Sequence, residues 1–493
     1  MPSCYLGIDI GTTGIKAAVF AADGAALGIG LAEYTLETPA PDIVELPPER
    51  YWEATKAAIA QAVDAAAIAP ADIASVGVTG QAETLIAVDS EELPLRKAIV
   101  WLDNRAVDEA AAIRNHFGDE ALFRMSGQTE MLPCWPAAKI LWLRNNEPEI
   151  FKRTAHFLMV EDFILFRLCG RYVTCACLMP STLYFDIRNG RYDAAMLDFL
   201  GISESQLPKL LLPGEIAGRC IANDSPLQPG TVATCCPIDH VCGNLGSGCT
   251  QQGVISETTG CSLALCASFP HPIYDEQRRI STYLGFTPGS YVLLPWAPTA
   301  GMLLKHFRDE FSAGRNYDAL TAEAAAIPPG SDGLVILPHC AGAVSPVCNP
   351  NARGVAYGIT LAHKRGHWTR AIMESVAYLL RDNVDVLRAM GLAIAEVRAL
   401  GGAAKSPLWL QIMADVLKMP VTVTSCEEAT ALGAAILGRV AAGDFTNAEA
   451  GADAMVRVRS TVSPSANAAA YEKEYQRYFN LNTLLLPTFR SQP

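Results

Sequence analysis

Residues 5–30, YLGIDIGTTGIKAAVFAADGAALGIG, contain the pattern that most restricts the fold of this chain. Two short apolar runs, Tyr5–Ile10 and Ile15–Phe20, enclose a small polar turn, and a strong hairpin signal, Asp23-Gly24, then precedes a third apolar run. The pattern therefore predicts three successive strands. A dinucleotide-binding fold or a P-loop needs a helix directly after its glycine turn, so the pattern excludes both.

The first turn has the chemistry of an anion site. Gly11, Thr12 and Thr13 offer backbone amides and two hydroxyls, with Lys16 nearby, and such loops can hold phosphates through their N–H groups. Asp9 lies in the apolar strand before the turn, where a carboxylate needs a partner. A magnesium ion that carries nucleotide phosphates is one candidate. An ordinary hairpin whose aspartate caps its own turn is the alternative.

The bulk properties exclude several classes of protein. A chain of 493 residues, half of them apolar, is too long for one core and predicts two or more domains. A net charge of −13 argues against nucleic acid or an anionic membrane as the main partner. The N-terminus does not read as a signal peptide, and no apolar run approaches the length of a membrane span. We therefore expect a cytoplasmic protein.

The stretch 235–244, CCPIDHVCGN, places Asp239 and His240 among three cysteines and could be a metal, thiol or acid–base site. The fifteen cysteines of the chain lack the paired spacing of zinc ligands. Their scatter through a long chain is typical of reduced thiols that fill space in the cytosol. These features favour an acid–base interpretation without deciding it.

Polar residues follow two predicted strands. Gln81, Glu83 and Thr84 come where the strand of 75–80 ends, and 103–105, Asp-Asn-Arg, follow the apolar run 98–101. Two strand ends that carry polar side chains suggest a ligand cleft, although each group alone could be a solvated loop.

The second half of the chain contains two glycine-containing loops that could also bind an anion. One is 256–262, SETTGCS, and the other is 401–405, GGAAK, between a strand at 397–400 and a helix that Ser406-Pro407 opens. Either could bind a nucleotide or serve close packing. Because each half has a Gly/Thr turn among apolar strands, we expect two similar α/β domains with a cleft between them.

Taken together, these segments resemble the FGGY carbohydrate kinases, which include kinases of xylulose, glycerol, gluconate and ribulose. The resemblance extends from Tyr5 to about Gly438. It rests on the order and spacing of nine stretches: 7–17 GIDIGTTGIKA, 76–81 VGVTGQ, 98–105 AIVWLDNR, 136–151 PAAKILWLRNNEPEIF, 239–248 DHVCGNLGSG, 349–358 NPNARGVAYG, 370–375 RAIMES, 401–421 GGAAKSPLWLQIMADVLKMPV and 428–438 EATALGAAILG.

The resemblance implies an α/β fold of two actin-like ATPase (ribonuclease-H-like) domains with ATP, magnesium and a small sugar in the interdomain cleft. It implies that Asp239 is the catalytic base and that Asp9 and Asp239 lie near the metal. The implied sugar contacts are Gln81, Glu83, Trp101, Asp103, Asp239 and His240. The implied ATP contacts are Gly11, Thr12, Thr13, Lys16, Gly260, Cys261, Gly401, Gly402, Ala403 and Ser406. Phosphoryl transfer to an alcohol needs this set of a base, a metal and amide donors.

The expected organisation is a sugar-binding domain at 1–247, a nucleotide-binding domain at 248–445 and a helical extension at 446–493. A homodimer is possible on the same resemblance. The expected reaction is ATP-dependent phosphorylation of a ketopentose such as D-xylulose to xylulose 5-phosphate. A kinase of glycerol, erythritol or gluconate and a sugar-sensing ATPase relative are the alternatives, and an actin-like ATPase switch is the competing class.

The sequence departs from the family pattern at several points. Gln81-Ala82-Glu83 matches neither the Gln-Met-His of xylulose kinases nor the Arg-Glu of glycerol kinases, and Asp239-His240 replaces the Asp-Gln of glycerol kinases. The usual Gly-Thr pair near the transferred phosphate is Gly260-Cys261, and Cys175 and Cys177 replace two polar groups. These departures put the identity of the sugar in doubt.

Overall fold

The computed structural model describes residues 4–490, and the contacts within the chain divide it into two units. Among the described residues, the first unit contains 4–250, 269–292 and 428–457, and the second contains 251–268, 293–427 and 458–490. The domain boundaries predicted at 247/248 and 445/446 remain a prediction. The contacts add that two later segments of the chain pack with the N-terminal one.

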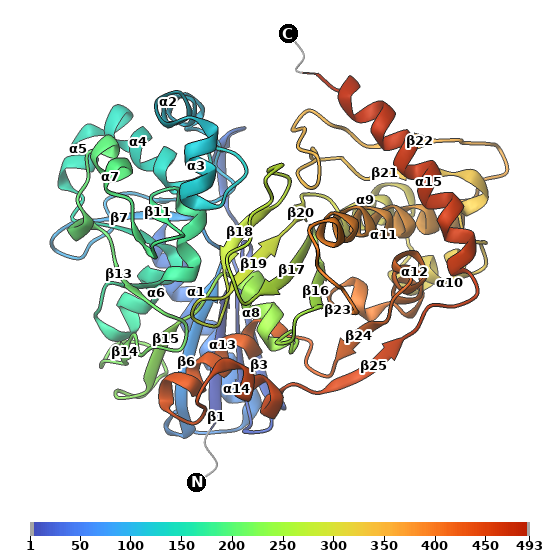
Figure 1. Ribbon diagram of the computed structural model, residues 1–493. Coiled ribbons are helices and arrows are strands. Elements are labelled where there is room, and N and C mark those ends of the chain that lie inside the picture. Colours follow the sequence, from blue (N-terminus) through green and yellow to red (C-terminus); the bar gives the residue numbers. More distant parts are fainter. Residues whose placement is uncertain (1–3, 491–493) are drawn as a thin grey trace. The chain divides into compact units, whose positions relative to one another are not determined.

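The first unit is built from a six-stranded mixed sheet, a smaller sheet and helices (Figure 1). Its strands are β1 (Cys4–Ile10), β2 (Gly14–Phe20), β3 (Ala26–Glu33), β4 (Glu37–Ala40), β5 (Ile43–Leu46), β6 (Ile73–Gly80), β7 (Leu85–Val88), β8 (Ala98–Ile99), β9 (His156–Met159), β10 (Val173–Cys175), β11 (Phe185–Asp186), β12 (Arg191–Tyr192), β13 (Lys209–Leu211), β14 (Gly218–Arg219), β15 (Val232–Cys235) and β18 (Ser281–Leu284). Its helices are α1 (Pro48–Ala66), α2 (Val107–Phe117), α3 (Asp119–Ser126), α4 (Pro136–Asn146), α5 (Pro148–Arg153), α6 (Val160–Cys169), α7 (Ala194–Leu200), α8 (Asp239–Gly246), α13 (Ala429–Ala442) and α14 (Ala448–Met455).

The second unit has one main sheet with helices. Its strands, counting β17 and β19 with it, are β16 (Val254–Thr259), β17 (Leu263–Phe269), β19 (Tyr291–Leu294), β20 (Trp296–Ala297), β21 (Val335–Leu337), β22 (Val355–Tyr357), β23 (Glu396–Gly401), β24 (Val421–Thr424) and β25 (Val458–Val462). Its helices are α9 (Gly301–Phe311), α10 (Tyr317–Ala325), α11 (Arg365–Ala389), α12 (Pro407–Leu417) and α15 (Ala468–Leu485).

The main sheets of the two units repeat one order of strand directions. In the first unit β3, β2 and β1 are antiparallel, β6 and β15 then run parallel to β1, and β14 is antiparallel again. In the second unit β20, β17 and β16 are antiparallel, β23 and β24 continue parallel to β16, and β25 is antiparallel. The predicted likeness of the two halves is therefore present in their topology.

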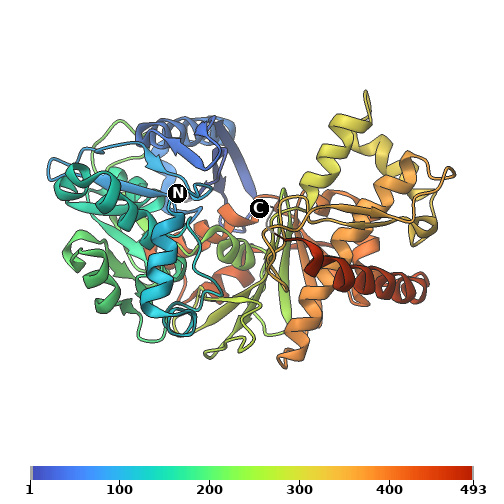
Figure 2. The ribbon, with the colours of Figure 1, turned by 90° about the horizontal axis from the view of Figure 1, so that it is seen from above.

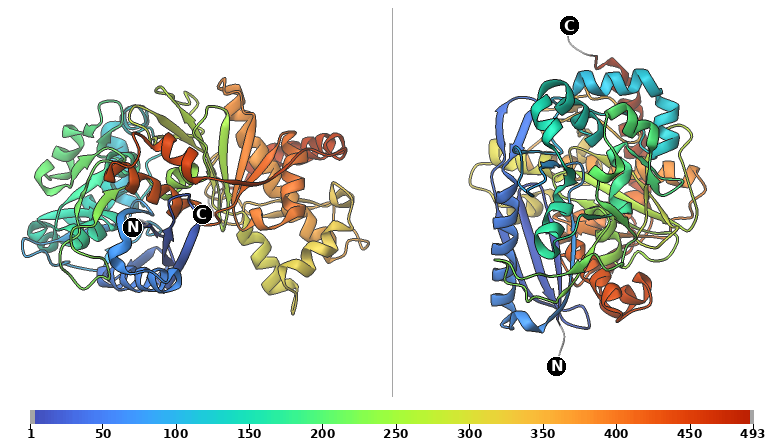
Figure 3. Two further views of the ribbon diagram at one scale, coloured as in Figure 1. Left: turned by 90° about the horizontal axis from the view of Figure 1, so that it is seen from below. Right: turned by 90° about the vertical axis from the view of Figure 1, so that its left-hand side faces the viewer.

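The predicted N-terminal strands are confirmed as β1, β2 and β3. In each, apolar side chains that alternate with small residues suit a strand with helices packed against it. The helix predicted at Tyr51–Ala67 is α1, which lies along β3 and β2 (Figure 2; Figure 3, right). Its buried Trp52, Ile59 and Val63 form the apolar stripe that helical spacing predicted.

Helix α13 completes the first unit although it comes from near the end of the chain (Figure 1; Figure 3, left). It packs on β1, β6 and α8 at backbone distance. A Cβ atom added to Gly246 of α8 would lie 1.8 Å from the Ala429 carbonyl oxygen, and one added to Gly433 of α13 would lie 2.0 Å from the Cys242 carbonyl oxygen. Only glycine allows so close an approach. Each of the two helices therefore has a glycine at the point where the backbone of the other helix packs against it.

Candidate active site

The β1–β2 hairpin carries the first group of predicted site residues. Asp9 pairs with Lys16 across the two strands, and the turn between them closes with the Gly11 amide donating to the Gly14 carbonyl at 3.0 Å. The Thr12 hydroxyl accepts a hydrogen bond from the Trp101 indole N–H at 3.0 Å, whereas Thr13 is exposed. The Lys16 ammonium pairs with the Glu428 carboxylate at 2.8 Å. The turn is therefore held in place from both sides.

The Asp9 carboxylate is poorly satisfied by the protein. Its Oδ1 atom is enclosed and has no hydrogen-bond partner among the residues that the structure describes. Burial and the negative charge of Asp239 together raise the pKa of Asp9 to about 7, against the opposing charge of Lys16. Asp9 and Asp239 therefore share one electrostatic environment, as a common site requires.

Asp239 is the first residue of α8, directly after the turn that follows β15. Its side chain is 30 % exposed, and its Oδ1 atom accepts the His240 amide N–H at 2.6 Å. The His240 ring nitrogen Nε2 lies 3.9 Å from the same oxygen. A carboxylate at a helix N-terminus is stabilised by the helix dipole. Asp239 thus combines solvent access with a fixed orientation.

Gln81 and Glu83 lie in the loop between β6 and β7. Both are buried, and the Gln81 Oε1 atom has no hydrogen-bond partner within the described part of the chain. Glu83 has a φ of +66°, a left-handed conformation that is rare for a residue with a side chain. Burial raises the pKa of Glu83 to about 7; the neighbouring Ser181 hydroxyl and Lys139 ammonium lower it, and Asp239 raises it. Such strain and buried charge are typical of functional sites.

Trp101 and Asp103 follow β8 but differ in availability. Trp101 is partly exposed, and its amide donates to the Thr84 hydroxyl at 3.1 Å. Asp103 is fully buried and accepts hydrogen bonds from the Val44 amide at 2.7 Å and from the Arg105 guanidinium at 2.9 and 2.7 Å. These bonds make Asp103 a brace between segments, and its contact with a sugar stays a prediction.

The second unit brings its own predicted residues together. Thr259 of β16 is paired with Gly401 of β23, so the turn at Gly260-Cys261 lies beside the loop that starts at Gly401. The Cys261 carbonyl accepts the Ala300 and Met302 amides at the start of α9, at 2.9 and 3.3 Å. The chain then continues through Gly402 and Ala403, and the Ser406 hydroxyl caps α12 by accepting the Trp409 amide at 3.3 Å. Ser406 is therefore engaged as a helix cap, as its predicted position indicated.

Comparison with known proteins decides the family. The N-terminal domain model of the FGGY family of carbohydrate kinases matches residues 4–246, and the C-terminal domain model matches 257–442. This chain belongs to the FGGY family of carbohydrate kinases.

Individual relatives support the same assignment. The chain is 30 % identical to a gluconokinase of Bacillus subtilis over 98 % of its own length and 96 % of that protein, and 27 % identical to a xylulose kinase of the same organism over 97 % and 96 %. The crystal structure of a xylulose kinase from Brucella ovis superimposes with a TM-score of 0.89 at 26 % identity, covering 98 % of this chain and 99 % of that one. The predicted fold class, two actin-like ATPase domains, is confirmed, and the chain is a sugar kinase that uses ATP.

Membership of the FGGY family makes magnesium the usual companion of ATP, and the first unit fits it. No group of three or more His, Cys, Asp or Glu side chains arranged for a metal occurs among residues 4–490. Mg²⁺ does not need one, because it is usually held by one or two carboxylates together with water and substrate phosphates. The enclosed, partnerless Oδ1 of Asp9 is a carboxylate oxygen of the required kind.

Several residues of this FGGY site were not predicted from the sequence. Burial and the charges of Glu83, Cys134 and Asp239 raise the pKa of Tyr283, and the Ser181 hydroxyl opposes the shift, so these groups lie near one another. Tyr283 belongs to β18, whose neighbour Thr282 donates its amide to the Gly127 carbonyl at 2.8 Å. No local pattern points to Tyr283, because it is a single aromatic residue far from Glu83 along the chain.

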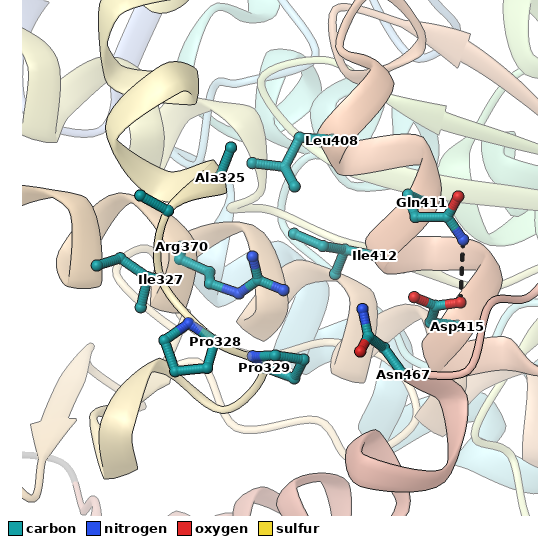
Figure 4. Close-up of a pocket in the computed structure, with 11 residues that line it drawn as sticks. Ala325, Ile327, Pro328, Pro329, Arg370, Leu408, Gln411, Ile412, Asp415 and Asn467 are labelled. Atoms are coloured by element: carbon teal, nitrogen blue, oxygen red, sulfur yellow. Dashed lines mark hydrogen bonds between the residues drawn. The ribbon is translucent and has the colours of Figure 1, made fainter.

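One described cavity of this kinase lies away from these residues. It has a volume of about 400 Å³ in the second unit, near the ends of α10 and α12 (Figure 4). The polar side chains that line it are engaged with the protein: Gln411 donates to Asp415 at 3.0 Å, and Arg370 donates to Glu374 at 2.9 Å. None of the predicted site residues lines it, and it reads as a packing space.

No helix among the described residues is long and apolar enough to span a membrane.

Proposed function

We propose that this protein transfers the γ-phosphoryl group of ATP to a hydroxyl of a small neutral sugar or polyol, with D-xylulose as the first candidate and xylulose 5-phosphate as its product. The observation that carries the proposal is the group formed by Asp239, Asp9 and Glu83, in which the charge of Asp239 raises the pKa of the other two carboxyls. Such a group supplies both a base for an alcohol and a carboxylate for a metal.

In this proposal Asp239 accepts the proton of the attacking hydroxyl. The new bond forms between the sugar oxygen and the γ-phosphorus, while the bond to the β-phosphate oxygen breaks and ADP leaves. Asp9 holds the magnesium ion, which neutralises phosphate charge when bound. Amides and hydroxyls of Gly11, Thr12 and Thr13 contact the phosphates. The proposed contacts of the remainder of ATP are Lys16, Gly260, Cys261, Gly401, Gly402, Ala403 and Ser406.

Charge favours a neutral acceptor over a sugar acid. Lys139, the cation that acts on Glu83, is already engaged with three backbone carbonyls, and Arg105, which acts on Lys139, is engaged with Asp103 and Glu45. A gluconate carboxylate would meet three carboxyl groups there, and like charges at short range disfavour binding. Gluconate nevertheless remains the second candidate, because a relative named gluconokinase is 30 % identical to this chain.

The sugar contacts in the proposal are Gln81, Glu83 and Trp101, with His240 beside the base. Asp103 supports them from behind through Arg105. We also propose a reducing compartment such as the cytoplasm, because no disulfide joins the cysteines among residues 4–490.

An ADP-release assay with D-xylulose, glycerol, erythritol and D-gluconate tests the proposal. We expect the highest kcat/KM with a neutral acceptor. Asp239→Asn should lower kcat by about 10³-fold while ATP binding is retained, because a positioned base contributes roughly 10²–10⁴-fold. Asp193→Asn at the N-cap of α7 is the matched control and should leave turnover intact, since asparagine caps helices equally well.

Each contrary outcome has a defined meaning. Substantial turnover by Asp239→Asn would refute the assignment of the base. Hydrolysis of ATP that no acceptor stimulates would indicate an ATPase switch. A silent wild-type enzyme across the panel would favour a sugar-sensing relative, which the exposed Cys261 in place of threonine also suggests.

A further inference from the structure

Lys139, in the first turn of α4, is completely buried, which is unusual for a lysine. Its ammonium group donates to three backbone carbonyl oxygens: Glu83 at 2.7 Å, Val100 at 2.9 Å and Ile99 at 3.4 Å. A lysine ammonium has three N–H donors, so this geometry uses all of them. No side-chain carboxylate takes a hydrogen bond from Lys139 among the bonds that the structure describes.

The three carbonyls belong to the two segments that carry the proposed sugar contacts. Glu83 lies in the loop between β6 and β7, and Ile99 and Val100 directly precede Trp101. The two segments also meet through the antiparallel pairing of Leu85 in β7 with Ile99 in β8, and through the Trp101 amide, which donates to the Thr84 hydroxyl at 3.1 Å. Lys139 adds a charged connection beyond the strand pairing, at the residues that lead into Trp101 and at Glu83 itself, and hydrogen bonds from a charged donor are about twice as strong as neutral ones.

The Lys139 hydrogen bonds hold a strained backbone conformation at Glu83. Its φ of +66° is a conformation that a non-glycine residue keeps only when its surroundings enforce it. The Glu83 carbonyl accepts the shortest of the three Lys139 hydrogen bonds. The same backbone conformation sets the direction of the Glu83 side chain, whose pKa is sensitive to Ser181 and Asp239.

The groups that face the ammonium keep it charged at neutral pH. Burial lowers the pKa of Lys139 to about 8, while Cys134, Glu83 and Asp103 raise it and Arg105 lowers it. The ammonium is therefore protonated at pH 7 and loses its proton at moderately alkaline pH.

We infer that Lys139 is a positioning residue for the acceptor: its ammonium clamps the two sugar-side segments together and thereby fixes the Glu83 carboxylate and the Trp101 indole. The inference rests on the proposed function in one respect, that these two side chains contact the sugar. The clamp itself is independent of any substrate.

The variant Lys139→Met tests the clamp, because methionine fills similar space without a donor. Leu143→Ala, buried about one helical turn after Lys139 in α4, is the control for a general loss of stability. Amide hydrogen exchange is measured without ligand on peptides covering 81–84 and 99–103. In Lys139→Met we expect exchange in both segments to rise about tenfold or more, and in Leu143→Ala we expect no such local rise.

Kinetics with D-xylulose and ATP supply the second measurement. Lys139→Met should raise the KM for D-xylulose by about 10- to 100-fold and leave the KM for ATP within about twofold, because a displacement of about 1 Å can cost 10²-fold. A folded variant with unchanged exchange in both segments would overturn the clamp. Equal losses towards the two substrates would overturn its role in positioning the acceptor.

The pH dependence of the wild-type enzyme tests the clamp without any substitution. The KM for D-xylulose should rise above about pH 8, with the KM for ATP unaffected, and a profile flat to pH 9.5 would contradict the inference. If D-xylulose is not phosphorylated at all, the proposed substrate fails, and the hydrogen-exchange result still decides the clamp.

Discussion

The contact between α8 and α13 leads to a quantitative prediction for Gly246→Ala. The added Cβ would lie 1.8 Å from the Ala429 carbonyl oxygen, and real Cβ atoms essentially never come within 3.0 Å of a neighbour. The helices must therefore separate by at least 1.2 Å, the difference of those two distances. Overpacking of this kind costs about 1–3 kcal/mol of unfolding free energy.

The displacement should also reach the active site. Asp239 and Gly246 are the two ends of α8, about 10 Å apart at 1.5 Å per residue, so a shift of the helix moves the proposed base. A displacement of about 1 Å can lower turnover on the order of 10²-fold. We expect kcat of Gly246→Ala to fall by that amount while the KM for ATP changes little.

The assay compares kcat in ADP release with the unfolding free energy in urea. Gly443→Ala is the matched control: its φ is +86°, and no atom lies within 4 Å of an added Cβ. It should lose about 1 kcal/mol through backbone strain and keep its turnover. If Gly246→Ala is folded and turns over at the wild-type rate, α13 does not hold Asp239 in place.

Three further predictions concern the core. Cys242→Ala should keep kcat/KM within about threefold, because the buried thiol makes only a weak hydrogen bond, to the Pro237 carbonyl at 3.4 Å; a hundredfold loss would give it a chemical role. Burial raises the pKa of Asp382 to about 7, so its contribution to stability is full below the unfolded pKa near 4 and lost as pH rises through 7. Asp382→Asn should therefore gain roughly 2–4 kcal/mol in urea unfolding at pH 8 and nothing at pH 4, and a constant difference would refute this. Arg370→Met leaves the buried Glu374 unpaired and should cost about 3–5 kcal/mol, most of it regained when Glu374→Gln is added; a single variant of wild-type stability would contradict the pairing.

Local patterns in the sequence predicted much of the fold. The alternation in β1 and β2 and the helical spacing in α1 and α11 are set by neighbours in sequence, so short windows contain the necessary information. The predicted capping of α12 by Ser406 is confirmed for the same reason. The family resemblance then supplied the roles of Asp9 and Asp239, which local patterns left open.

Long-range packing could not be predicted in this way. Nothing near Gly246 shows that its packing partner is Ala429, and nothing near Glu83 points to Tyr283. The sequence also does not show that the Asp103 carboxylate accepts hydrogen bonds from the Arg105 guanidinium and from the Val44 amide, which lies far away along the chain. Lys139 is detectable in the sequence, because it is a lone cation in the apolar run PAAKILWL. A lysine is almost never fully buried unless its charge is paired.

The return of residues 428–457 to the first unit has a consequence for synthesis of the protein. A ribosome releases residues 1–250 long before it makes α13, and at 5–20 residues per second the delay is on the order of 10–40 s. During that interval the surfaces around Gly7, Gly77 and Gly246 wait for a helix that does not yet exist. A nascent or truncated chain that ends before residue 457 therefore exposes an incomplete packing surface and should depend on chaperones until residues 428–457 emerge.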